Sequence, residues 1–281
     1  MIDIATELDL LRQRVSGWKR DGLRVGFVPT MGNLHAGHRS LVELARERAD
    51  RVVASVFVNP TQFGPGEDFD RYPRTPRQDA EMLGAAGCDL LWMPDVEAMY
   101  PFGPALAVRL RVPGVTEVLE GAHRPGHFDG VATVVARLLN QVQPDLAVFG
   151  RKDYQQLAVI RHLVIDLAFP VEVVGAPTLR EADGLAMSSR NQYLGPQERV
   201  LAPCIHRTLL GMRDATRTGQ APDRVEADAA AALAAAGFQV DYAAVRTPQL
   251  RAPADGSGPR VALVAARLGR TRLIDNLEFD I

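Results

Sequence analysis

The sequence predicts an α/β protein: a Rossmann-like, mostly parallel sheet flanked by helices, with a smaller α+β domain after it. Over about the first 175 residues, apolar runs of strand length alternate with segments of helical period. Such alternation is typical of βα units and of parallel strands. After residue 178 the order changes to helices followed by strands. We therefore expect a larger Rossmann-like domain at residues 1–178 and a smaller α+β lid domain at residues 179–281.

The elements of the first domain follow from apolar periodicity and from the turn formers between them. Thr6 is expected to cap the opening helix, and Pro29 is expected to end the first strand. The predicted strands are residues 23–28, 51–57, 89–92, 106–110, 146–149 and 171–174. Further helices are predicted after Gly37, at 75–86, at 131–140 and after Gly150.

The second domain opens with a polar loop at residues 179–194. Two helical stretches, 196–217 and 222–236, are predicted next. Strands are then predicted at 240–245, 261–267 and 271–276, with a flexible connection at 252–259.

Composition excludes several classes of protein. The 281 residues are 47% hydrophobic and 23% charged, with a formal net charge of -2, so no basic field favours nucleic acid. No apolar run approaches the roughly 18 residues that span a bilayer, and charged residues interrupt residues 1–15, which argues against a signal peptide. Cys88 and Cys204 are too few for a disulfide framework or a zinc site. We expect free thiols and a cytoplasmic protein.

Residues 29–38 carry the strongest functional signal. Gly32 and Gly37 let the backbone turn tightly and approach a ligand. His35 and His38 are placed where a strand gives way to a helix N-terminus, which suits a phosphate. Two imidazoles there can donate hydrogen bonds to phosphoryl oxygens. The alternative is an ordinary turn, which a single Gly-x-x-His usually marks.

Two other segments have related chemistry. In residues 150–153 a glycine follows a strand and precedes Lys152, which can reach a phosphate, and Asp153, which suits ribose hydroxyls. Residues 187–190 offer two hydroxyls and a guanidinium, a set that binds phosphates. The alternatives are a solvated Lys-Asp pair and a turn before a helix.

Other polar residues near the strand ends have less specific patterns. Gln62 and Gln156 can orient a hydroxyl or a carboxylate, although each alone is typical of a surface. His123 and His127 flank Arg-Pro-Gly, a pattern of an anion-binding loop or, more often, of a structural turn. The residues expected to be solvated are Asp68, Asp70 and Asp79. No acyl nucleophile is evident, so positioning of phosphates is favoured over covalent catalysis.

Taken together, the motifs resemble those of the pantothenate synthetase (pantoate–β-alanine ligase) family, within the HxGH nucleotidyltransferase superfamily. Residues 29–38 are similar to a variant of the HxGH signature, and Met-Ser-Ser-Arg at 187–190 stands where the superfamily has its second, basic signature. The differences between this sequence and the family's motifs are small. The other matching segments are 57–63, 72–74, 124–128, 149–156, 186–191 and 271–276.

This resemblance implies a two-step reaction, with ATP and pantoate bound by the domain at 1–178. ATP and (R)-pantoate form a pantoyl adenylate with release of pyrophosphate, and the amine of β-alanine then displaces AMP to give pantothenate, a coenzyme A precursor. Mg²⁺ accompanies ATP, with protein ligands that the sequence does not identify. The resemblance also implies a homodimer, while charge and apolar run length indicate no nucleic-acid or membrane partner.

The resemblance assigns roles residue by residue. His38 is the implied proton donor, and His35 and Lys152 are the other catalytic residues. Gln62 and Gln156 bind pantoate, and Gln62 also binds β-alanine. The implied ATP-binding residues are Pro29, Met31, Gly32, Asn33, Leu34, His35, Ala36, Gly37, His38, Gly150, Arg151, Lys152, Asp153, Leu179, Met187, Ser188, Ser189 and Arg190.

Three other interpretations remain at the level of sequence. An HxGH nucleotidylyltransferase that adenylates a different small acid or phosphate shares the first signature but needs no β-alanine. A truncated class I aminoacyl-tRNA synthetase is disfavoured by the lack of a basic surface. A sensor that binds ATP without turnover is the non-enzymatic alternative.

Overall fold

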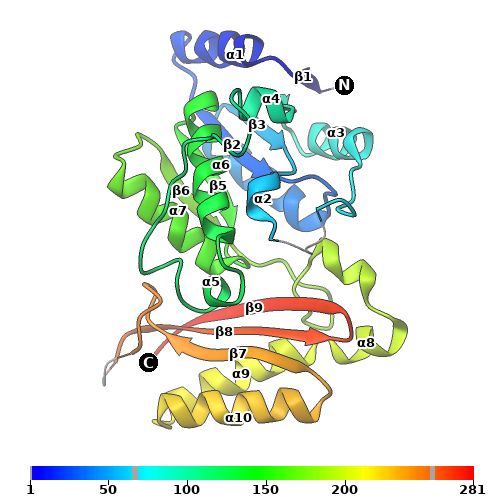
Figure 1. The fold of residues 1–281 in the computed structure, drawn as a ribbon, viewed down its shortest axis with the longest axis vertical. Coiled ribbons are helices and arrows are strands. Elements are labelled where there is room, and N and C mark those ends of the chain that lie inside the picture. The colour runs from blue at the N-terminus through cyan, green and yellow to red at the C-terminus, as the bar shows by residue number, and fades with distance from the viewer. Residues whose placement is uncertain (1, 65–68, 254–256) are drawn as a thin grey trace. The chain divides into compact units, whose positions relative to one another are not determined.

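The computed structural model describes residues 2–64, 69–253 and 257–281 (Figure 1). The chain divides into two compact units, Met1–Arg151 with Gln156–Pro177, and Lys152–Gln155 with Thr178–Ile281. Asp68 and part of the predicted connection 252–259 lie outside the described residues. The role of residues 179–281 as a lid stays a prediction.

Six described strands of the first unit form a parallel sheet in the order β1-β4-β3-β2-β5-β6, which confirms the predicted fold class. β2 therefore lies between β3, on one side of the sheet, and β5, on the other. The strand order reverses between β2 and β5, and such a switch point is where open α/β sheets bind ligands. The strands are β1 (Asp3–Ala5), β2 (Val25–Thr30), β3 (Arg51–Val56), β4 (Leu90–Trp92), β5 (Leu146–Gly150) and β6 (Glu172–Ala176).

Strand predictions were wrong in three places. Pro29 does not end β2 but lies within it. It pairs with Ser55 of β3, two residues beyond the last β2 residue that pairs with β5, where a missing N–H is tolerated. β1 was not predicted because only Ala5 of its three residues is buried. Residues 106–110 form no strand, since Leu106 and Val108 are exposed instead of packing on a sheet.

Helices cover both faces of this sheet. On one face, α1 (Leu8–Arg20), α6 (His127–Val142) and α7 (Tyr154–Asp166) share a core with β2 and β5. On the other, α2 (Ala36–Arg48) and α3 (Pro76–Ala85) enclose a second core. Glu7 rather than Thr6 is the N-cap of α1, without a side-chain cap bond. The short helices are η1 (Pro60–Gln62), α4 (Val96–Met99) and α5 (Glu120–His123).

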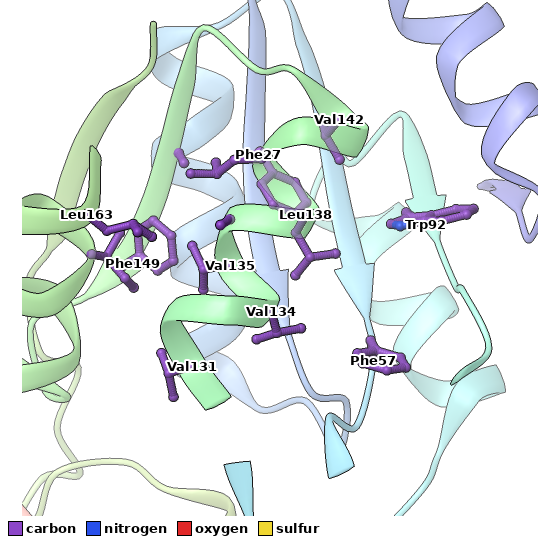
Figure 2. Close-up of a cluster of buried hydrophobic side chains, with 14 of the residues drawn as sticks. Phe27, Phe57, Trp92, Val131, Val134, Val135, Leu138, Val142, Phe149 and Leu163 are labelled. Atoms are coloured by element: carbon purple, nitrogen blue, oxygen red, sulfur yellow. The ribbon is translucent and has the colours of Figure 1, made fainter. Parts of the chain in front are cut away.

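The apolar spacing of α6 explains its position. Val131, Val135, Leu138 and Val142 recur every three or four residues, so they lie on one face of the helix. Figure 2 shows this face beside Phe27 of β2, with Phe149 of β5 in the same cluster. The packing fixes α6 against the strands that flank the switch point.

The second unit is an antiparallel sheet with helices packed against it. Its strands are β7 (Gln239–Arg246), β8 (Pro259–Leu268) and β9 (Thr271–Asp280). The predicted helix 196–217 is two helices, since Pro203 removes a backbone donor between them. The other elements are η2 (Ser189–Tyr193), α8 (Pro196–Leu201), α9 (Cys204–Arg217) and α10 (Pro222–Ala235). Leu209 of α9 and Leu233 of α10 are buried in one core with the strands of the sheet.

No helix in the described parts of the chain is both long and apolar enough to cross a membrane.

The two cysteines are free, as predicted, and we expect them to react differently. Burial raises the pKa of the Cys88 thiol to about 12, so almost no thiolate forms near neutral pH. Cys204 is partly exposed at the start of α9. Ellman's reagent should therefore titrate one thiol rapidly in the native protein and a second only in denaturant. The Cys204→Ser variant should lose the rapid reaction, and two rapid thiols in the native protein would contradict the burial of Cys88.

Candidate active site

The candidate site is built at the switch point of the parallel sheet. The glycine- and histidine-containing turn follows Thr30 at the carboxyl end of β2. The segment beginning at Gly150 ends the neighbouring strand β5. Among the described residues, and apart from the two chain neighbours of Gly150, no atom lies within 4 Å of where a Cβ on Gly150 would be, so a ligand can approach the backbone there. The prediction that both loops follow strands is confirmed.

The two histidines hold the start of α2. His35 is the N-cap residue, and its Nδ1 accepts a hydrogen bond from the N–H of Gly37 at 3.1 Å. His38 lies one turn into the helix, and its Nδ1 accepts from the N–H of His35 at 3.3 Å. The ring centroids are 4.2 Å apart. This is a capping box built from two imidazoles instead of the usual hydroxyl and carboxylate.

These contacts determine where each neutral imidazole carries its proton. A ring nitrogen that accepts a hydrogen bond has no proton, so Nε2 must be the protonated nitrogen of both His35 and His38. Nε2–H is a donor, and phosphoryl oxygens accept. The backbone of the turn thus prepares both side chains to donate to an anion at the N-terminus of α2.

The turn before the histidines is held by Asp79, a residue expected to be solvated. That expectation is wrong: Asp79 is only 2% exposed. Its two carboxylate oxygens accept from the N–H groups of Asn33 at 3.1 Å and Leu34 at 2.9 Å. No sequence pattern indicated this role, because an Asp in the first turn of a helix is usually explained by the helix dipole.

Gln62 is also buried, at 8% exposure, and belongs to a network that sequence reasoning missed. Its Nε2 donates to Sδ of Met31 at 2.9 Å, and its Oε1 accepts from Nδ2 of Asn59 at 3.1 Å. Oδ1 of Asn59 accepts in turn from the hydroxyl of Tyr100 at 2.7 Å. Asn59 precedes a proline in a predicted loop, and that turn signal concealed its role. Gln62 is thereby tied to the histidine-containing turn through Met31.

His127 contacts the backbone of Gln62. Its Nδ1 donates to the backbone carbonyl of Gln62 at 2.8 Å, since a carbonyl can only accept. Arg124 lies 3.1 Å from Nε2 of the same ring. Of the two predicted roles for His123 and His127, this favours the structural turn for His127, because the ring fixes η1 at the start of α6.

Lys152 is the cationic residue of the segment 150–153 that follows β5. Its side chain is 18% exposed, and Nζ lies 3.8 Å from the carboxylate of Asp153, which is 48% exposed. Its carbonyl accepts from Nδ2 of Asn276 at 2.8 Å, which fixes the backbone to β9 within the second unit. Of the 32 Lys and Arg residues in the chain, only Lys19 and Lys152 are lysines. A compact ammonium is therefore used at this position in a chain whose other cationic side chains, apart from Lys19, are arginines.

The loop at residues 179–190 of the second unit is held by an ion pair and a backbone hydrogen bond. Arg180 forms a bidentate ion pair with the buried Asp275, at 2.6 and 3.0 Å. The N–H of Met187 donates to the carbonyl of Leu179 at 3.0 Å, which joins the two predicted ATP-binding segments of this unit. Ser188 caps η2 by accepting from the N–H of Arg190 at 3.2 Å.

The predicted residues fall into two groups. The first unit holds the turn at 29–38, Gln62, Gly150, Arg151 and Gln156, the last in the first turn of α7. Lys152 and Asp153 belong with Leu179 and residues 187–190 in the second unit. That both groups act on one ATP stays a prediction. Among the described residues, no three His, Cys, Asp or Glu side chains form a group that could hold a metal ion.

Comparison with known proteins gives a consistent result. The family model described as pantoate-beta-alanine ligase matches residues 3–278. A pantothenate synthetase of Stenotrophomonas maltophilia strain K279a is 66% identical over 99% of this chain and 100% of its own length. A pantothenate synthetase of Xanthomonas campestris pv. campestris strain B100 is 65% identical over 99% of this chain and 100% of its own.

Solved structures agree with the sequence matches. A pantothenate synthetase of Thermus thermophilus superposes with a TM-score of 0.90 at 51% identity, covering 98% of this chain and 99% of that one. The pantoate-beta-alanine ligase of Francisella tularensis, solved with beta-gamma ATP and beta-alanine, gives a TM-score of 0.82 at 31% identity, covering 99% and 97%.

Proposed function

The chain belongs to the pantoate–β-alanine ligase family, and on that premise we propose that it activates (R)-pantoate with ATP and transfers the pantoyl group to β-alanine. The observation that supports the proposal most directly is the pair of imidazoles at the N-terminus of α2, beside the switch point of the sheet. The complex of the Francisella tularensis enzyme with an ATP ligand and β-alanine supports the choice of substrates.

In the proposed first step, a carboxylate oxygen of pantoate attacks the α-phosphorus of ATP. The bond to the bridging oxygen breaks, and pyrophosphate leaves with the electron pair. Nε2–H of His35 and His38 would donate to phosphoryl oxygens as negative charge grows on them. Lys152 and Arg190 would add positive charge, and Ser188 and Ser189 hydroxyl donors. We assign His38 as the residue that donates to the leaving group: its Nε2–H hydrogen-bonds the departing oxygen, and pyrophosphate leaves as an anion while the ring keeps its proton.

In the proposed second step, the amine of β-alanine attacks the acyl carbon of the adenylate. The acyl–oxygen bond breaks, AMP leaves with the electron pair, and the nitrogen passes a proton to solvent water to give the amide. Gln62 and Gln156 would orient pantoate through neutral hydrogen bonds, and Gln62 would also contact β-alanine. The network through Asn59 supports this role, because it directs the Gln62 amide toward Met31 of the histidine-containing turn.

Mg²⁺ is proposed to accompany the nucleotide. This ion keeps several waters and binds nucleotide phosphates with few protein carboxylates. The donor chemistry of the described residues, which contain no cluster of three metal-ligating groups, fits an ion held mainly by ATP. Bound there, it would neutralise phosphate charge during attack.

A cytoplasmic homodimer is proposed for the protein as a whole. One feature of the described chain supports a protein contact: Phe102, Leu106 and Val108 are large apolar residues that are 82%, 79% and 74% exposed within one segment. Light scattering should give twice the chain mass of 30.6 kDa, and a monomer at all concentrations would contradict the dimer.

One coupled assay tests the function. Pyrophosphate release is expected only when ATP and pantoate are both present, and AMP release only when β-alanine is added as well. A sensor that binds ATP without turnover would release no pyrophosphate. An HxGH nucleotidylyltransferase for another acid or phosphate would ignore pantoate, and would release no AMP in response to β-alanine.

A further inference from the structure

We propose that Asp79 is a positioning residue for the histidine-containing turn, and that it acts on catalysis through His35 and His38. The effect of Asp79 on turnover rests on the proposed function, whereas its structural role at the turn does not. Asp79 lies on α3, 46 residues from Asn33 in the sequence, yet its carboxylate accepts from the backbone of this turn. It is therefore a tertiary brace for a loop that the local sequence does not fix.

The turn needs a brace because its backbone is strained. Gly32 has φ +83° and Asn33 has φ +52°, so two consecutive residues adopt the left-handed region. Only the first is a glycine. The carboxylate of Asp79 lies against this bend, 3.0 Å from where a Cβ on Gly32 would be. Its bonds to two consecutive N–H groups hold the chain in the conformation that leads into α2.

One residue separates the contact of Asp79 from the first imidazole. The N–H of Leu34 donates to the carboxylate of Asp79 at 2.9 Å, and His35 is the next residue in the chain. The N–H of His35 then donates to Nδ1 of His38, and the N–H of Gly37 donates to Nδ1 of His35. If residues 33 and 34 rotate, the N–H of His35 rotates too. Both acceptor bonds that keep Nδ1 unprotonated then weaken, and Nε2 loses its role as the obligatory donor.

Both oxygens of Asp79 are required. Each accepts one backbone N–H, and Oδ1 also accepts from the hydroxyl of Thr75 at 3.1 Å. An amide has one acceptor oxygen, so Asp79→Asn must turn an NH₂ donor toward one of the two backbone donors. This substitution conserves size and shape and removes one acceptor oxygen together with the negative charge, which makes it the sharpest test.

The experiment compares Asp79→Asn with a matched control, Thr75→Val. The control removes the hydroxyl bond to the same carboxylate but leaves both bonds to the turn. Asp79→Asn should lower kcat for pantoate-dependent pyrophosphate release by about 10- to 100-fold at a temperature where the variant is folded. KM for β-alanine should change less than kcat. Thr75→Val should stay within about 3-fold of wild type, because the turn keeps its brace.

A second measurement requires no turnover. Two-bond ¹H–¹⁵N spectra of the imidazoles should show the Nε2–H tautomer for His35 and His38 in wild type and in Thr75→Val. In Asp79→Asn they should show a mixture of tautomers. Equal losses of activity in the two variants, or unchanged tautomers in Asp79→Asn, would overturn the proposal. Wild-type protein with the expected tautomers but no pantoate-dependent turnover would instead refute the proposed function and leave the role of Asp79 standing.

Discussion

Lys152→Ala is expected to reduce pantoate-dependent pyrophosphate release by at least about 10²- to 10³-fold, the usual cost of removing one group that stabilises transition-state charge. The fold should not suffer, because Nζ has a carboxylate partner 3.8 Å away that is itself about half exposed. Such pairs contribute about 0–1 kcal/mol to stability. The backbone carbonyl of Lys152, which accepts from Asn276, remains in the variant.

The chain supplies a matched control for this variant. Lys19 is the other lysine, and it too pairs with an aspartate, Asp145, at 3.0 Å. Lys19→Ala removes the same charge and a shorter ion pair, outside every predicted site segment, so activity should be unchanged. Lys152→Arg should restore only part of the rate, since a planar guanidinium does not replace a mobile ammonium. Normal pyrophosphate release by folded Lys152→Ala would remove Lys152 from the catalytic set.

Gly130→Ala is expected to lower the stability of the protein strongly. A Cβ at this position in α6 would lie 2.6 Å from Cα of Gln62, against backbone that cannot move aside like a flexible side chain. The carbonyl of Gly130 also accepts from Nδ2 of Asn59 at 3.2 Å. We expect the free energy of unfolding to fall by about 3 kcal/mol. Because η1 must shift, KM for pantoate should rise by about 10-fold or more.

The control for Gly130→Ala is the same substitution in another helix of the same unit. Gly17 lies in α1, and a Cβ there would meet, among the described residues outside the backbone of its own helix, one atom of the Arg20 side chain at 4.0 Å. Gly17→Ala should stabilise by about 0.5–1 kcal/mol, because alanine loses less backbone entropy in a helix. Urea unfolding measures both variants, and pantoate titration of the pyrophosphate assay measures KM. Gly130→Ala with wild-type stability would show that α6 and η1 are not in close contact.

Local pattern was sufficient for most elements of the fold. The apolar spacing of α6 and the branched apolar run of β3 identify a helix and a buried strand without tertiary information. It failed where packing decided the outcome. Leu106 and Val108 alternate as in a strand but are exposed and join no sheet in the part of the chain that the structure describes. Pro203 divides what the periodicity joined into one helix. Periodicity reports which side of a segment is apolar, not what lies against that side.

The candidate site shows the same division. Residues 29–38, Lys152 and the loop at 187–190 were identifiable because glycine, imidazole and cationic side chains at strand ends have few structural uses. Asp79 and Asn59 could not be identified in this way, because each acts through hydrogen bonds to partners that only the tertiary structure brings within reach. Gln62 looked like a surface residue until burial and the contact with Met31 placed it.

By itself, then, the sequence determined the α/β class and the residue types that can bind a phosphate, because both depend on side-chain chemistry and short-range spacing. The tertiary structure decided which groups orient those residues: the carboxylate of Asp79 at the strained turn, and Asn59 behind Gln62. A buried hydrogen bond depends on the position of both partners in space. For residues 46 positions apart, that position is set by the packing of α3 beside the sheet rather than by local sequence.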